Sequence, residues 1–195
     1  MSNRRYLVGA FFIIMAQLTL AEDEAMPEYA VVSGWSIRVD TSMDNGCFAF
    51  AEYERGSILR VGVDNRDSSV YALFGNEDWR SIEYGKKYDV EIQFGNETKW
   101  NGKATGMSFD PPQNQPYLWV AIVGEDAVVN FISEFMAETS VELFYNGNSI
   151  DKLKLEGSYA AGLKVIECQK VMRSNNSNTK DPFAQPGSSS DPFST

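Results

Sequence analysis

Carboxylates are the side chains of this sequence with the widest choice of chemistry. Three pairs of acids lie close together in the chain: Glu52 and Glu54, Glu77 and Asp78, and Asp89 and Glu91. Two carboxylates with well-separated pKa values can catalyse the hydrolysis of a glycosidic bond. In the first and third pairs, however, both acids lie on one face of an expected strand and alternate with aromatic or apolar residues. This pattern favours a solvated strand face over a catalytic pair.

The sequence contains no histidine. Ser-His-Asp and Cys-His catalysis, the usual zinc sites and the commonest general base near neutral pH all depend on histidine. Enzymes that use carboxylates, lysine or tyrosine remain possible. No glycine-rich loop joins a strand to a helix, so the usual pattern for binding phosphates is also missing. We therefore expect no cofactor, and a non-catalytic protein is favoured over an enzyme.

Oxygen ligands for calcium are present in the turn that contains Asp64, Asn65 and Asp67. The twelve-residue spacing of a calcium-binding loop and its terminal bidentate glutamate are missing. We therefore expect an ordinary turn here and no metal site.

Trp79 is the tryptophan that we expect nearest to the surface, because it follows the turn-forming residues 75–78. An exposed aromatic ring can contact sugars or proteins, which makes Trp79 a weak candidate for a binding residue. Core packing is the favoured interpretation, because large aromatic residues dominate the cores of β domains. Trp35, Trp100 and Trp119 lie in strand patterns and are also expected in the core.

Residues 1–21 have the three parts of a secretory signal peptide. Arg4 and Arg5 precede an apolar run over residues 6–20, and Ala21 is a small residue at the expected cleavage site. A membrane anchor is the alternative, but polar residues interrupt a run that is shorter than the roughly 20 residues of a spanning helix. We expect a periplasmic or secreted protein with no membrane span after the signal peptide is removed.

Cys47 and Cys168 are the two cysteines of the chain. In an oxidising compartment they are expected to form a disulfide. Two distant cysteines without histidine do not make a zinc site, and a catalytic thiol would need a neighbouring base. On the chain-entropy model, closing a loop of about 120 residues stabilises the folded state by about 4 to 5 kcal/mol.

The net charge limits the choice of partners. It is formally −10, and loss of the signal peptide would remove two arginines and no acids. Nucleic acid and anionic membranes repel such a chain, since it has no basic stripe. Another envelope or secreted protein is the expected partner. An inhibitor or immunity-type protein is one form of this hypothesis, because an acidic surface steers association with a basic partner.

Period-2 patterns and turn residues predict a single β-rich domain over residues 35–172. The strand candidates cover residues 35–40, 47–54, 57–64, 70–74, 88–94, 98–106, 117–123, 140–145 and 149–155. Asn146 and Gly147 supply the two positive φ angles of a type I′ turn between the last two strands. Helical spacing begins near Asp126, the expected N-cap of one helix, and again at Ser158, the expected cap of a second.

The expected fold class is therefore mainly β (α+β). These elements predict an antiparallel β-sandwich or partly open β-barrel of about eight to nine strands, with two helices late in the chain.

Two flanking segments lie outside this domain. Residues 22–34 are acidic without a sustained period and are expected to form a linker. Residues 173–195 are rich in Asn, Ser, Pro and Gly and are expected to be disordered. This tail repeats Asp-Pro-Phe at residues 181–183 and 191–193. A short duplication in a variable terminus is favoured over a pair of docking motifs.

The C-terminal part of the domain resembles small exported domains of Gram-negative bacteria. The residues that carry the resemblance are Leu153-Lys154-Leu155-Glu156-Gly157-Ser158, Ala161 and Cys168-Gln169. In those proteins a strand ending in L-x-L-x-G-S leads into a short helix ending in C-Q. An early cysteine lies in a strand after a tryptophan-bearing one, and Cys47 and Trp35 would take these places here. The domains are of unknown function, so the resemblance implies a periplasmic location and no catalytic or binding residue.

The leading hypothesis is a non-catalytic periplasmic or secreted protein-binding module. A histidine-free, carboxylate-dependent hydrolase of cell-wall or carbohydrate substrates is the alternative from another class. A small-ligand carrier is a third possibility, because β-barrels can hold a ligand in the mouth of the barrel. A deep cleft with two acids, one of them with a raised pKa, would favour the hydrolase.

Overall fold

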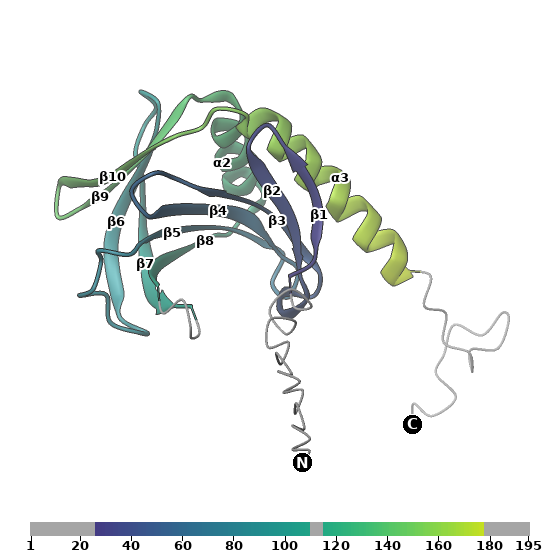
Figure 1. Ribbon diagram of the computed structural model, residues 1–195, viewed down its shortest axis with the longest axis horizontal. Helices are drawn as coiled ribbons and strands as arrows, with labels where there is room; N and C mark the ends of the chain where they lie inside the picture. Colours follow the sequence, from purple (N-terminus) through teal and green to yellow (C-terminus); the bar gives the residue numbers. More distant parts are fainter. Residues whose placement is uncertain (1–25, 110–114, 178–195) are drawn as a thin grey trace, which may run out of the picture.

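The structure is a computed structural model that describes residues 26–109 and 115–177 (Figure 1). These residues form one antiparallel sheet of ten strands, one 3-10 turn and two α-helices late in the chain. The strands are β1 (Glu28–Val32), β2 (Trp35–Asp40), β3 (Gly46–Glu52), β4 (Ser57–Asp64), β5 (Ser69–Asn76), β6 (Lys87–Phe94), β7 (Trp100–Ser108), β8 (Pro116–Ile122), β9 (Ser140–Tyr145) and β10 (Asn148–Lys154). The helices are α2 (Glu125–Ala137) and α3 (Ser158–Ser177), and the 3-10 turn is η1 (Thr41–Met43). The predicted fold class is confirmed.

The sheet is open. Its strand order is β1-β2-β3-β4-β5-β8-β7-β6-β9-β10, so β1 and β10 are the two edges. The sheet curves strongly, and the chain just after β10 comes close to the turn between β1 and β2 (Figure 1). The arrangement corresponds to a partly open barrel, with a seam between β10 and the strands at the other end of the sheet.

The two faces of the sheet differ in what they pack against. In β4, Leu59 and Val61 belong to the main core, which α2 and α3 help to enclose. Ile58, one residue out of phase with them, belongs to a smaller cluster on the other face. Successive side chains of a strand point to opposite faces, so the central strands are apolar on both sides.

The helices complete the main core with aromatic contacts. Phe135 of α2 meets the ring of Trp35 edge-on, with ring centroids 5.4 Å apart, and Phe131 meets Phe94 at 5.0 Å. Both phenylalanines are about 1 % exposed. No helix of the residues that the structure describes is long and apolar enough to cross a membrane.

The boundary predictions need correction at both ends. Residues 28–32, expected in a linker over residues 22–34, form strand β1 and pair with β2. Its burial alternates weakly, because it is an edge strand, and this explains why no period was detected. At the other end, α3 continues to Ser177, beyond the expected boundary at residue 172. Residues 1–25 and 178–195, with the expected signal peptide and the repeated Asp-Pro-Phe triplets, lie outside the described residues.

The local turn predictions had mixed outcomes. Asn146 and Gly147 have φ angles of 51° and 75°, as the type I′ turn requires. Asp126 is not the N-cap of α2, because Gly124 takes that position without a side-chain cap. Asp126 lies in the first turn instead, where a carboxylate interacts favourably with the helix dipole.

Candidate functional site

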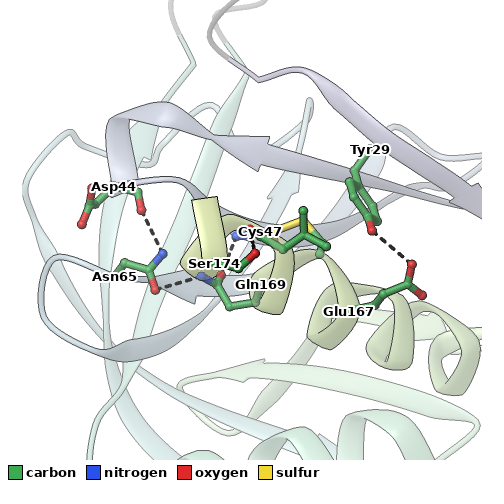
Figure 2. Close-up of a disulfide and its surroundings, with 9 residues drawn as sticks. Tyr29, Asp44, Cys47, Asn65, Glu167, Gln169 and Ser174 are labelled. Carbon is green, nitrogen blue, oxygen red and sulfur yellow. Dashed lines mark hydrogen bonds between the residues drawn. A yellow bond between two sulfur atoms is a disulfide. The ribbon is translucent and has the colours of Figure 1, made fainter. Parts of the chain in front are cut away.

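The predicted disulfide is present and joins β3 to α3 (Figure 2). Cys47 and Cys168 are both 0 % exposed, and their Cα atoms lie 6.1 Å apart. The neighbouring Gln169 strengthens this junction: its Oε1 accepts a hydrogen bond from the backbone N–H of Cys47 at 3.0 Å. Its Nε2 donates to Asn65 Oδ1 at 3.2 Å. The resemblance motif C-Q therefore has a structural role here.

The acidic turn considered for calcium is occupied by structural contacts. Asp64 Oδ2 pairs with Arg66 Nη2 at 2.5 Å, and the hydrogen bond from Arg66 lowers the pKa of Asp64. Asn65 Nδ2 donates to the carbonyl oxygen of Asp44 at 2.9 Å, and Asp67 Oδ1 accepts from the N–H of Ser69 at 3.1 Å. Within residues 26–109 and 115–177, no group of three or more His, Cys, Asp or Glu residues could hold a metal ion.

The three pairs of acids lie on the surface or have cations beside them. Glu52, Glu54, Glu77 and Asp78 are exposed. Asp89 pairs with Lys103 of β7 at 2.5 Å, and Glu91 pairs with Lys99, just before β7, at 2.6 Å. No contact brings the two members of a pair together as an acid and a base.

Trp79 is half-buried and packs against the main core. Trp35 is buried as expected, whereas Trp100 and Trp119 are half-buried. Trp119 stacks on Tyr71 with ring centroids 3.9 Å apart, on the face opposite the helices. The role of Trp79 in binding stays a prediction.

A buried arginine that the sequence analysis did not single out lies on that opposite face. Arg60 is 4 % exposed, and its Nη2 pairs at 2.5 Å with Asp40 Oδ2, which is 2 % exposed. Its Nε donates to Tyr71 Oη at 2.6 Å, and its guanidinium carbon lies 3.6 Å from the ring centroid of Phe48. Burial raises the pKa of Tyr71. The cation has partners on several sides, so its role is structural.

The seam of the open barrel forms a groove of about 1060 Å³, which we call the seam groove. Residues 149–154 of β10 line one side of it. Residues 156–157, which follow β10, belong to the same side, and residues 33–35, 51–55 and 57, at or next to the ends of β2, β3 and β4, line the other side. The two sides are distant in sequence and meet only because the sheet curves.

Two hydrogen bonds hold the C-terminal end of β10 to the far side of the seam. Trp35 Nε1 donates to the carbonyl oxygen of Glu156 at 2.9 Å, and Tyr53 Oη donates to that of Lys154 at 2.7 Å. Gly157 then passes so close to Ser33 that a Cβ atom on it would lie 2.5 Å from the carbonyl oxygen of Ser33. Its φ of +82° is a second reason for glycine. The L-x-L-x-G-S motif thus closes one end of the seam.

Asp151 is the side chain of the seam groove that is best suited to accept a hydrogen bond from a ligand. Its Oδ2 is buried and has no hydrogen-bond partner in the described part of the chain. Burial raises the pKa of Asp151, while hydrogen bonds from the Ser57 side chain and the Lys152 backbone partly oppose that rise. The pairing of β9 with β10 shifts between Ser149 and Asp151. Asp151 lies two residues before Leu153 and opposite Leu143, so it is on the same face as these two core residues.

The surroundings of Asp151 support it from one side. Ser57 is 3 % exposed and its Oγ accepts a hydrogen bond from Asn76 Nδ2 at 2.8 Å. Tyr53 has a raised pKa because of burial first and the charge of Asp151 second. Oδ2 of Asp151 is thus the acceptor in this part of the groove that a hydrogen-bond donor from a ligand would satisfy.

Sequence reasoning did not single out Asp151, Ser57 or Tyr53. One signal for Asp151 was available, because it is in phase with Leu153 and Leu155 on the buried face of its strand. A carboxylate in that phase needs a partner. Ser57 gives no comparable signal, because its position opposite Asp151 follows from the curvature of the whole sheet.

A second surface with binding capacity lies on α3. Tyr159, Leu163 and Ile166 follow the i, i+4, i+7 spacing of one helix face and are 62 %, 48 % and 41 % exposed. Exposed apolar residues that gather in this way are a feature of interaction sites. This stripe competes with the seam groove as a binding surface.

Comparison of the chain with family models, with curated proteins and with solved structures finds no match. The resemblance to small exported domains therefore stays a prediction, and the function is argued from the groove itself.

Proposed function

We propose that this chain is a non-catalytic protein-binding module, exported to the periplasm or secreted, that binds an extended segment of its partner in the seam groove. One observation carries the proposal: six consecutive residues of an edge strand, 149–154, line the groove. The outer edge of such a strand presents N–H and C=O groups that can pair with an added strand.

The two edges of the sheet are not equivalent. The edge strand β1 lies beside α3 (Figure 1), and Tyr29 Oη donates to Glu167 Oε1 at 3.1 Å across this contact (Figure 2). The edge of β10 borders a groove instead. The volume of about 1060 Å³ lies just above the roughly 300–1,000 Å³ of ligand pockets. A peptide segment fits this size better than a very small ligand does.

The edge of β10 carries features that discourage indiscriminate pairing. Lys152 and Lys154 are charged residues in the strand, and the bulge between Ser149 and Asp151 interrupts a regular ladder. Both devices protect natural edge strands from aggregation. A segment that binds here must therefore match the groove side chains, which supports selective recognition.

The disulfide and the charge support the location and the kind of partner. The disulfide between Cys47 and Cys168 supports an oxidising compartment. The net charge of −10 supports a basic partner. An inhibitor or immunity-type role is the form of the proposal in which this charge steers association.

Hydrogen exchange with selected peptides tests the proposal. Peptides from a random linear library, selected on the oxidised protein, are expected to slow amide exchange over residues 148–154. Ile150→Glu places a charge in the groove and is expected to weaken binding by about tenfold or more. The matched control is Val31→Glu on the opposite edge, where Val31 is 65 % exposed; this variant is expected to bind normally. Protection confined to α3 around Leu163 would overturn the proposal.

Identification of the partner calls for a second experiment. Cross-linked affinity purification from the native envelope or culture fluid, at two salt concentrations, is expected to capture one stoichiometric basic protein. Capture that weakens with salt supports the inhibitor form, because exposed charges are screened within about 10 Å at 0.1 M salt. Capture indifferent to salt refutes that form.

A carboxylate-dependent hydrolase is the second candidate function, and one observation favours it. Asp151 has a raised pKa and shares the groove with the exposed acids Glu52, Glu54 and Glu156. A protonated Asp151 would be the acid and an exposed glutamate the base. Turnover of peptidoglycan fragments or oligosaccharides by the wild-type protein, lost in Asp151→Asn, would replace the binding proposal with this one.

A further inference from the structure

The unpartnered oxygen of Asp151 defines what the seam groove can recognise. Oδ2 of this carboxylate is buried and has no hydrogen-bond partner in the described residues. Ser57, which lines the same groove, is itself held by Asn76 Nδ2 at 2.8 Å. A buried oxygen of this kind lowers the stability of the folded protein when nothing binds to it. A ligand that donates a hydrogen bond removes that cost.

The charge of the groove favours a cationic donor. Four acids line it, Glu52, Glu54, Asp151 and Glu156, against three bases, Arg55, Lys152 and Lys154. Lys152 already pairs with Glu142 at 2.9 Å. A cation that enters the groove therefore meets a surplus of negative charge.

The lysines of β10 are poorly placed to neutralise Asp151 from within the chain. Lys152 and Lys154 are one and three residues away along the strand, and an odd separation puts side chains on opposite faces. Arg55, in the turn between β3 and β4, is exposed. None of the ion pairs within residues 26–109 and 115–177 includes Asp151. Arg55 is therefore the internal competitor that an experiment has to control.

We infer that Asp151 binds one ammonium group, the side chain of a lysine in the segment that occupies the seam groove. This inference rests on the proposed function and names the chemistry that the groove selects. An ammonium group is a compact charge that binds well to a single oxygen, whereas a guanidinium group is matched to both oxygens of a carboxylate at once. Within the described residues Oδ2 is the oxygen of Asp151 that is buried without a partner, so the site offers a single acceptor and favours lysine over arginine.

Three host peptides test this selectivity, with the sequence acetyl-Thr-Val-Xaa-Val-Thr-amide and Xaa as lysine, arginine or norleucine. Binding to the oxidised protein is measured by calorimetry, and the site is mapped from the amide NMR signals of β10. The wild-type protein is expected to bind the lysine peptide about tenfold more tightly than the norleucine peptide, and more tightly than the arginine peptide.

Two variants assign the preference to Asp151. Asp151→Asn, which is nearly isosteric, is expected to bind the lysine and norleucine peptides equally, and unchanged amide NMR signals outside residues 149–153 would show an intact fold. Asp89→Asn is the matched control, because Asp89 is an exposed strand carboxylate paired with Lys103. It is expected to keep the full preference. Arg55→Gln is expected to keep or increase it.

Several outcomes separate this inference from the proposed function. Equal binding of all three peptides along β10 would overturn the inference and leave the proposed function standing. A lysine preference that survives in Asp151→Asn, or an arginine peptide that binds as tightly as the lysine peptide, would also overturn it.

If no peptide binds, n-butylammonium is the remaining probe. Shifts of the signals of residues 149–153 that vanish in Asp151→Asn would support ammonium binding and overturn the proposed function. No shifts would overturn both.

Discussion

Asp40 and Asp151 are two carboxylates of the same sheet with opposite surroundings. Asp40 is 2 % exposed and pairs with Arg60, and its Oδ1 accepts hydrogen bonds from the N–H and the hydroxyl of Ser42 at 2.9 Å and 2.6 Å. Asp151 has a buried oxygen without a partner and borders a groove. A buried charge with all its partners fixes the structure around it. A buried charge that lacks a partner marks a position where a ligand can bind.

The same contrast extends to the two ends of the sheet. At the β1–β4 end, the disulfide and Gln169 hold α3 against β3, and the Arg60–Asp40 pair links β4 to the end of β2. At the β10 end, the strand is held by the hydrogen bonds at Glu156 and Lys154. Strong cross-links on one side allow the other side to keep an open, less stable edge for binding.

The largest effect is expected when the β1–β4 end of the sheet loses its disulfide bond to α3. The double variant Cys47→Ser/Cys168→Ser removes a bridge between residues 121 positions apart. The free energy of unfolding is expected to fall by about 4 to 5 kcal/mol on the chain-entropy model. Urea unfolding of the oxidised wild-type protein and of the variant measures this difference. Superimposable unfolding curves would refute the stabilising role of the bridge.

The next largest effect concerns the buried Asp40–Arg60 ion pair at the β1–β4 end of the sheet. Asp40→Asn leaves Arg60 buried without its counter-charge, and such a change costs about 3–5 kcal/mol. The same unfolding measurement applies. In the double variant Asp40→Leu/Arg60→Met neither charge is left unpaired, so much of the lost stability is expected to return. A double variant less stable than Asp40→Asn would contradict this account of the pair.

A smaller effect of opposite sign is expected in the seam. Asp151→Asn removes a charge that the fold does not fully satisfy, so stability at neutral pH is expected to rise by about 1 kcal/mol. The pKa of Asp151 is raised by burial above its ordinary value of 3.8, so the folded state holds this proton more tightly than the unfolded state does. The destabilisation by Asp151 is therefore absent below pH 3.8 and grows as the pH rises toward the folded pKa.

Unfolding of the wild-type protein and of Asp151→Asn between pH 3 and pH 8 tests this dependence. The stability advantage of the variant should widen with pH and then level off. A constant difference across the range would show that the charge of Asp151 is not the cause.

The sequence predicted local features better than features that depend on the curvature of the sheet. The Asn146-Gly147 turn, the strands and the two late helices follow from local patterns, and the disulfide follows from the number of cysteines and the expected compartment. Strand β1 was missed because it buries little. Arg60 was missed because its partner Asp40 lies on another strand. Both faces of β4 are also buried, so no simple alternation of apolar and polar residues marks Arg60 as a buried side chain. Ser57 and Asp151 meet only after ten strands have curved round, which no local pattern encodes.

The smallest effect is expected from a carboxylate that is neither buried nor unpaired. Asp89 is 83 % exposed and pairs with Lys103, which is 68 % exposed. Asp89→Asn is expected to change the free energy of unfolding by no more than about 0.5 kcal/mol, because exposed pairs contribute little and salt screens them. The same substitution thus destabilises strongly at Asp40, stabilises at Asp151 and is neutral at Asp89. A large loss at Asp89 would show that removal of any acid on this sheet is costly, and the comparison between Asp40 and Asp151 would then lose its meaning.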